Sequence, residues 1–192
     1  QRVSPNQFDP SAKMAFTLHP AARPSDEGPY IPSMVRRAFT DLTRRPHLGV
    51  NVDYIGSTSP AKLHRETLHR LADVAHPGVS FRFHGGPLDA AFQSSLATVA
   101  APERFEMGGY TAAVASVLTT SDIFITPMAE GSYASSDIAL QEAMHAGVAP
   151  VVWDTTGPAH MITDGVDGRV VSSGEDFTRA VQSLCDDPNL RA

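Results

Sequence analysis

The sequence has little cysteine, few cations and no long apolar run, and each shortage excludes a class of protein. The single cysteine, Cys185, cannot form a disulfide within the chain, so a reducing compartment, the cytoplasm, is the expected location. Fifteen Lys and Arg stand against 21 Asp and Glu, and the net charge of −6 argues against nucleic acid or an anionic membrane as a partner. No apolar run approaches the ~20 residues that span a bilayer, and no stretch is typical of a signal peptide, so no membrane-spanning segment is expected.

The chain does contain enough apolar sequence for a core. Its 192 residues are 42% hydrophobic and 19% charged, which suits one folded domain and excludes a disordered chain. The first residue is Gln1 where a complete protein begins with Met, which indicates a piece of something longer. Residues 1–12 are polar and unpatterned and are predicted to be a linker, and residues 13–192 are predicted to form the domain.

Segments with the alternation of a strand recur between segments with the apolar spacing of a helix. Strands are predicted at residues 14–18, 48–55, 79–83, 105–107, 123–125, 151–153 and near Val170. Helices are predicted at residues 31–42, 63–74, 88–100, 111–118, around Glu142 and at 177–184, with a short helix after 153. This order predicts a single doubly wound, Rossmann-like α/β domain with a mainly parallel sheet. The proline-rich segment 19–32 is predicted to be a long loop.

The segment 121–171 is the expected centre of function. An apolar strand there ends at Thr126-Pro127, and a small-residue loop, a helix and a second strand follow. Parallel strands present such loops at their carboxyl ends, where open α/β sheets bind ligands.

Two polar features in this segment each have a structural and a functional interpretation. Glu142 is either a solvated helix carboxylate or a carboxylate aimed at paired hydroxyls such as those of a ribose. The loop 130–136 brings small residues to a helix start, which favours an anion there, although Ser135 or Ser136 would also serve as an ordinary N-cap. Asp137 favours the helix but opposes a phosphate placed beside it.

No metal site is predicted. The Asp164–Gly168 run lacks the remaining ligands of a calcium loop, and its Asp-Gly pairs are ordinary turn formers. None of the eight histidines forms a pair at ligand spacing that a third ligand supports. Cys185 lies in an amphipathic segment and is predicted to pack in the core.

Residues 121–171 resemble the donor-binding domain of GT-B glycosyltransferases, in particular the large retaining family with the E-x7-E motif. That family has a strand ending in Pro, then E-G-F-G-x-x-x-x-E-A-M-A-x-G, then a strand and a G-x-x-E-x-x-x-x-G segment. The matching parts of this chain are His84–Pro87, Gly109–Tyr110, Asp122–Pro127, Glu142–Gly147, and Gly157, His160 and Gly165 at the spacing of the last segment. His160 stands where the family more often has Glu.

The resemblance implies the C-terminal domain of a retaining, hexosyl-type glycosyltransferase that binds a nucleotide-diphosphate sugar. It implies that Glu142 holds the ribose and that Glu130 contacts the sugar as the catalytic residue. The remaining implied contacts are Gly109 and Tyr110 at the base, Ser135 and Ser136 over the diphosphate, and Arg23 and Lys62 as its cations. The acceptor site would belong to a missing N-terminal domain, so the chain alone would have little activity. No cofactor is implied.

Besides His160, the chain departs from the family pattern in two places. The family spacing puts the first Glu at Ala134, whereas Glu130 lies four residues further from Glu142. The family also carries an Arg and a Lys in the loop after its first strand. The loop after the predicted strand 14–18 offers Arg23 but has Glu27 or Gly28 in place of the Lys, which leaves Lys62 in the following strand-to-helix loop as the substitute.

Two other functions remain open. A degenerate domain of this fold, retained for scaffolding or protein contacts, would explain the displaced Glu, the missing Lys and the acidic balance. A nucleotide-sugar epimerase of GT-B shape would need an N-terminal partner domain as well.

Overall fold

The computed structural model describes residue 39 and residues 41–132, 137–154 and 157–191. Predictions that fall on other residues lie outside this description, among them the linker 1–12, the strand 14–18, the loop 19–32 and most of the helix 31–42. The strands are β1 (Val50–Ile55), β2 (Val79–His84), β3 (Phe105–Gly109), β4 (Ile123–Thr126), β5 (Ala149–Trp153) and β6 (Arg169–Val171). The helices are α1 (Thr67–Ala72), α2 (Ala90–Leu96), α3 (Val114–Leu118), α4 (Ile138–His145) and α5 (Gly174–Asp186), with short 3-10 turns η4 (Pro102–Arg104), η5 (Gly157–Met161) and η6 (Pro188–Arg191).

All six described strands run parallel in one sheet, in the order β3-β2-β1-β4-β5-β6. The chain therefore winds outward from β1 through β2 to β3, returns to the centre, and winds outward again from β4 to β6. This double winding confirms the predicted α/β fold with a parallel sheet.

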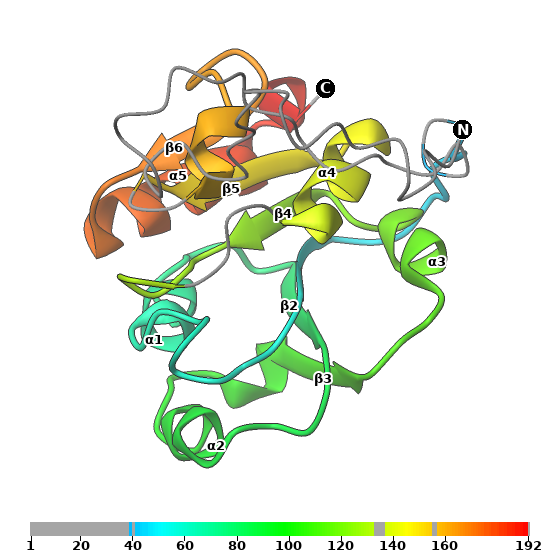
Figure 1. Cartoon of the computed structure of the whole chain (residues 1–192). Coiled ribbons are helices and arrows are strands. Elements are labelled where there is room, and N and C mark those ends of the chain that lie inside the picture. The colour runs from blue at the N-terminus through cyan, green and yellow to red at the C-terminus, as the bar shows by residue number, and fades with distance from the viewer. Residues whose placement is uncertain (1–38, 40, 133–136, 155–156, 192) are drawn as a thin grey trace, which may run out of the picture.

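Helices cover both faces of the sheet, and each face has its own apolar core (Figure 1). One core joins the sheet to α1, α2 and α5, and its fully buried side chains include Leu71, Phe81 and Phe177. The other joins β4 and β5 to α3 and α4, through Leu118 and Leu140 among others. A strand with a core on each face is buried on both sides, so its sequence is a continuous apolar run, as in β4.

Within the described residues the order of strands and helices agrees with the sequence-based prediction, whereas several helix bounds differ. Helices α1, α2 and α3 are shorter than predicted, because the residues that flank them lie in turns, bends and, at Leu63, a β-bridge. Helix α5 is longer, since Ser173 caps it by accepting a hydrogen bond from the Asp176 N–H at 3.1 Å. The short helix predicted after β5 is the 3-10 turn η5.

The first two strand-to-helix loops approach each other closely at the carboxyl edge of the sheet. The Gly56 N–H donates to the His84 carbonyl at 2.8 Å, and a Cβ on Gly85 would lie 2.1 Å from the Gly56 carbonyl oxygen. Only a residue without a side chain fits at position 85 with this spacing. The loop that leaves β1 therefore has a fixed starting point.

Candidate functional site

The strand order places a topological switch point between β1 and β4. The connections from these two neighbouring strands leave in opposite directions, α1 toward one face and α4 toward the other (Figure 1). Open α/β sheets bind ligands in the crevice at the carboxyl ends of such a strand pair. The candidate site is therefore built from the loop after β1, the loop after β4 and the start of α4.

The loops after β1 and β4 are joined by backbone hydrogen bonds. The His64 N–H donates to the Pro127 carbonyl at 2.8 Å, and the Ala129 N–H donates to the Lys62 carbonyl at 2.8 Å. Leu63 and Met128 form an antiparallel bridge between these bonds, and both side chains are buried. The two sides of the switch point are consequently held at a fixed distance.

Lys62 and Asp137 face each other across the site. The Lys62 ammonium, 18% exposed at the side chain, lies 3.6 Å from Oδ2 of Asp137. Asp137 is the N-cap of α4, and its Oδ1 accepts a hydrogen bond from the Leu140 N–H at 3.1 Å. The sequence singled out Lys62 as a substitute cation, and the structure places it at the start of the helix that carries Glu142.

Glu142 is 6% exposed, so the solvated-helix interpretation of this carboxylate is wrong. It lies on α4 among the buried residues Leu140, Gln141 and Ala143. Burial of a charged side chain needs partners or a special role, because desolvation of a carboxylate costs several kcal/mol, by order of magnitude, when it is uncompensated.

The other predicted site residues are more scattered. Glu130 is exposed in a turn within the loop after β4, next to Gly131 with its φ of +70°. Tyr110 is 81% exposed after β3, an edge strand that lies two positions from β1, or about 10 Å away. Gly109, whose φ is +65°, ends β3 and accepts a hydrogen bond from the Gly85 N–H at 2.9 Å. Arg23, Ser135 and Ser136 lie outside the described residues.

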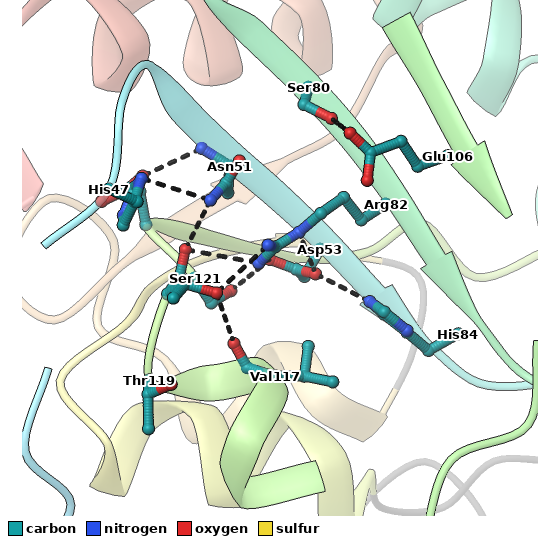
Figure 2. Close-up of polar contacts among 12 residues, drawn as sticks. His47, Asn51, Asp53, Ser80, Arg82, His84, Glu106, Val117, Thr119 and Ser121 are labelled. Atoms are coloured by element: carbon teal, nitrogen blue, oxygen red, sulfur yellow. Dashed lines mark hydrogen bonds and ion pairs between the residues drawn. The ribbon is translucent and has the colours of Figure 1, made fainter. Parts of the chain in front are cut away.

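A buried polar cluster beneath this edge was missed by the sequence analysis. Asp53 in β1 is fully buried, and both its carboxylate oxygens accept hydrogen bonds from the Arg82 guanidinium, at 3.0 and 2.6 Å. Oδ1 also contacts Nε2 of His84 at 3.1 Å, and Oδ2 accepts from the Ser121 hydroxyl at 2.6 Å (Figure 2). These bonds tie β2 and β1 to Ser121, two residues before β4, so the cluster links the segments that flank the switch point. An acidic residue inside a strand with an alternating apolar pattern was the signal that could have found it.

The Asp164–Gly168 run is a turn, and the Asp164 side chain stabilises it. Oδ1 of Asp164 accepts hydrogen bonds from the Val170 N–H at 2.9 Å and from Nε of Arg169 at 3.0 Å. The hydrogen bond from the Val170 N–H, and to a smaller extent the one from the Arg169 side chain, holds the pKa of Asp164 below its usual range. Among the described residues, no three His, Cys, Asp or Glu side chains group in a way that could hold a metal ion.

The doubly wound sheet with its site between β1 and β4 defines a domain of the Rossmann class, and the comparisons narrow this class to one family. The sequence profile of the family described as Glycosyl transferases group 1 matches residues 49–187, well over half of the chain, and the chain belongs to this family. The match begins at the residue before β1, so Lys62 lies in the loop after the first strand of the matched part, whereas Arg23 precedes the match. A search of the curated proteins found no match.

Solved GT-B glycosyltransferases have the same fold. WaaG, a glycosyltransferase involved in lipopolysaccharide biosynthesis, is 18% identical with a TM-score of 0.67, over 76% of this chain and 40% of WaaG. HepE from Anabaena, in complex with UDP-glucose, is 16% identical with a TM-score of 0.64, over 74% of this chain and 40% of HepE. The C-terminal domain of LpcC from Francisella tularensis is 16% identical with a TM-score of 0.64, over 83% of this chain and 87% of that domain. The chain thus spans well under half the length of WaaG and HepE and corresponds in size to the isolated LpcC domain.

Within the described residues, no helix has the length and apolarity needed to cross a bilayer.

Proposed function

We propose that this chain is the nucleotide-diphosphate-sugar-binding domain of a retaining glycosyltransferase that adds a hexose to an acceptor held by a separate domain. The observation that carries the proposal is the position of Lys62. Lys62 lies in the loop after β1, and its ammonium is 3.6 Å from the carboxylate of Asp137, the N-cap of α4. The family places a diphosphate-binding lysine in the loop after its first strand, and β1 is the first strand of the matched part.

The charges at the site support binding of a diphosphate on the Lys62 side of the crevice. The ammonium supplies a cation, and the first N–H groups of α4 supply the partial positive charge of a helix N-terminus. Asp137 opposes this charge because it caps the same helix. We therefore assign the diphosphate to the Lys62 side of the crevice, away from the Asp137 carboxylate.

The remaining contacts follow from the order of the strands. Glu142 on α4 would bind the ribose, and the ends of β2 and β3, with Gly109 and Tyr110, would hold the base further along the edge. Glu130 stands in the loop after β4 as the candidate catalytic contact to the sugar. HepE, whose structure contains UDP-glucose, shares the fold and supports a ligand of this class.

Thermal unfolding with a panel of UDP, ADP, GDP and their glucose conjugates tests the proposal. A ligand at ten times its Kd stabilises the folded chain by ~1.4 kcal/mol, which is about 3–5 °C for a domain of this size. We expect a shift with at least one nucleotide, and a smaller one for Lys62→Met, which keeps the aliphatic stem and removes the charge. Arg65→Met is the matched control, since Arg65 is exposed three residues further along. No shift with any nucleotide at millimolar concentration would favour the degenerate scaffolding domain.

A further inference from the structure

Oδ2 of Asp137, at the switch point, has no hydrogen-bond partner in the described part of the chain. Asp137 is 5% exposed, and its Oδ1 caps α4. Buried carboxylate oxygens are nearly always hydrogen-bonded, because the loss of water is otherwise uncompensated. The nearest cation, the Lys62 ammonium, lies 3.6 Å away, which is too far for a hydrogen bond.

The hydroxyl of Thr126, at the end of β4, also has no hydrogen-bond partner among the described residues. Thr126 is the last residue of the strand and is fully buried. The loop after β4 leads from Thr126 to Asp137. Two unsatisfied polar groups at the carboxyl end of one strand mark a place built for a polar ligand.

The chemistry of the Lys62–Asp137 gap selects the ligand group. A phosphate oxygen has no proton to donate to Oδ2 at neutral pH and is repelled by it, and a cation is repelled by the ammonium. A hydroxyl donates to the carboxylate and accepts from the ammonium at the same time. An oxygen about 2.8 Å from both atoms fits two groups that are 3.6 Å apart.

We propose that Asp137 and Lys62 together bind one hydroxyl of the donor sugar, so that Asp137 determines sugar recognition. This inference rests on the proposed donor-binding function. It assigns the sugar contact to a residue that the family spacing does not select, since that spacing falls on Ala134, and it provides a buried contact in addition to the exposed Glu130.

The charge of Asp137 acts differently on the two forms of the ligand. A free nucleoside diphosphate gains nothing from Oδ2 and is repelled by it, whereas a nucleotide sugar satisfies Oδ2 with its hydroxyl. The ratio of the Kd of UDP to the Kd of UDP-glucose therefore reports the contact. The same ratio is measured with the ADP and GDP pairs.

Asp137→Asn is the informative variant, because asparagine is an equally good N-cap and α4 keeps its first hydrogen bond. Isothermal titration with UDP and UDP-glucose should show a Kd ratio about tenfold lower than in the unmodified chain, with UDP bound as tightly or more tightly. Asp89→Asn is the matched control. Asp89 caps α2 by accepting from the Ala91 N–H at 2.8 Å, and its substitution should leave the ratio unchanged.

Each other outcome contradicts the assignment in a distinct way. An unchanged ratio means that water alone occupies the gap. Loss of UDP and UDP-glucose binding by the same factor places the hydroxyl on the ribose, which both ligands contain. If the unmodified chain binds none of the nucleotides, the donor-binding function itself fails and the sugar contact fails with it.

Discussion

Arg82 on β2 and Asp53 on β1 stand directly opposite each other in the sheet and form a two-pronged ion pair, with N–O distances of 3.0 and 2.6 Å. The carboxylate is fully buried, and the arginine also donates to the Thr120 hydroxyl at 3.1 Å. Because His84 on β2 and Ser121, just before β4, complete the shell of Asp53, this cluster joins β1 and β2 to the segment that leads into β4.

Asp53→Asn should strongly destabilise the fold. The amide cannot replace both acceptor oxygens, and the Arg82 guanidinium, whose side chain is only 16% exposed, loses its counter-charge, so we expect the free energy of unfolding to fall by ~3–5 kcal/mol. Urea unfolding followed by far-UV circular dichroism measures the change. Glu106→Gln is the control on the same face of the sheet, since Glu106 is exposed and accepts from Ser80 at 2.8 Å, and it should change stability by less than ~0.5 kcal/mol. Equal effects of the two substitutions would show that the Asp53–Arg82 pair stabilises the fold no more than the exposed Ser80–Glu106 hydrogen bond does.

Alanine substitutions at the adjacent glycines Gly85 and Gly86 should have different effects on the stability of the fold. A Cβ on Gly85 would lie 2.1 Å from the Gly56 carbonyl oxygen, whereas a Cβ on Gly86 meets no atom within 4 Å. Gly85→Ala should cost ~1–3 kcal/mol through the forced shift of the loop after β1, and Gly86→Ala should be close to neutral. Differential scanning calorimetry measures both. Since that loop carries Lys62, Gly85→Ala should also weaken nucleotide binding, and a fully stable Gly85→Ala would contradict the close approach.

The two predicted carboxylates should differ in their effect on donor binding. Glu142→Gln keeps the volume of the side chain but removes the charge, and we expect nucleotide affinity to fall by ~10–100-fold, the equivalent of ~1.5–3 kcal/mol for hydrogen bonds to a charged group. Glu130→Gln should have a smaller effect on affinity, because Glu130 is exposed and assigned to the sugar alone. Isothermal titration gives both values, with the melting temperature of each variant as the check on folding. The reverse order would mean that the ribose contact is Glu130.

Cys185 should be unreactive in the folded chain. It is buried on α5, and burial raises the pKa of its thiol to about 12. Alkylation by iodoacetamide at pH 8 should therefore be slow in buffer and fast in guanidinium chloride, where the pKa is ~8.5. The folded pKa is the higher one, so the thiol's contribution to stability is present below pH ~8.5 and is lost as the pH rises toward 12. Cys185→Ala should reduce this alkaline loss, and rapid labelling of the native chain would contradict the burial.

Sequence periodicity was sufficient for the fold and for part of the site. Alternating and helical apolar patterns gave the parallel α/β class, because burial on both faces of a sheet forces continuous apolar strands such as Ile123–Thr126. The match around Glu142 pointed to the helix after β4, which the structure places at the switch point. Helix ends were predicted less well, since they depend on individual caps such as Ser173.

The amino-acid sequence alone determined the class of this domain, because apolar periodicity and turn residues act locally and leave a direct record in the chain. Only the tertiary structure paired Asp53 with Arg82 and Lys62 with Asp137, residues that are 29 and 75 positions apart. Such pairs depend on strand order and on how loops meet at a sheet edge, and these are properties of the folded chain as a whole. The structure placed Lys62 beside Asp137 at the start of α4 and left Oδ2 of Asp137 without a hydrogen-bond partner among the described residues, and the proposed sugar contact rests on these two observations.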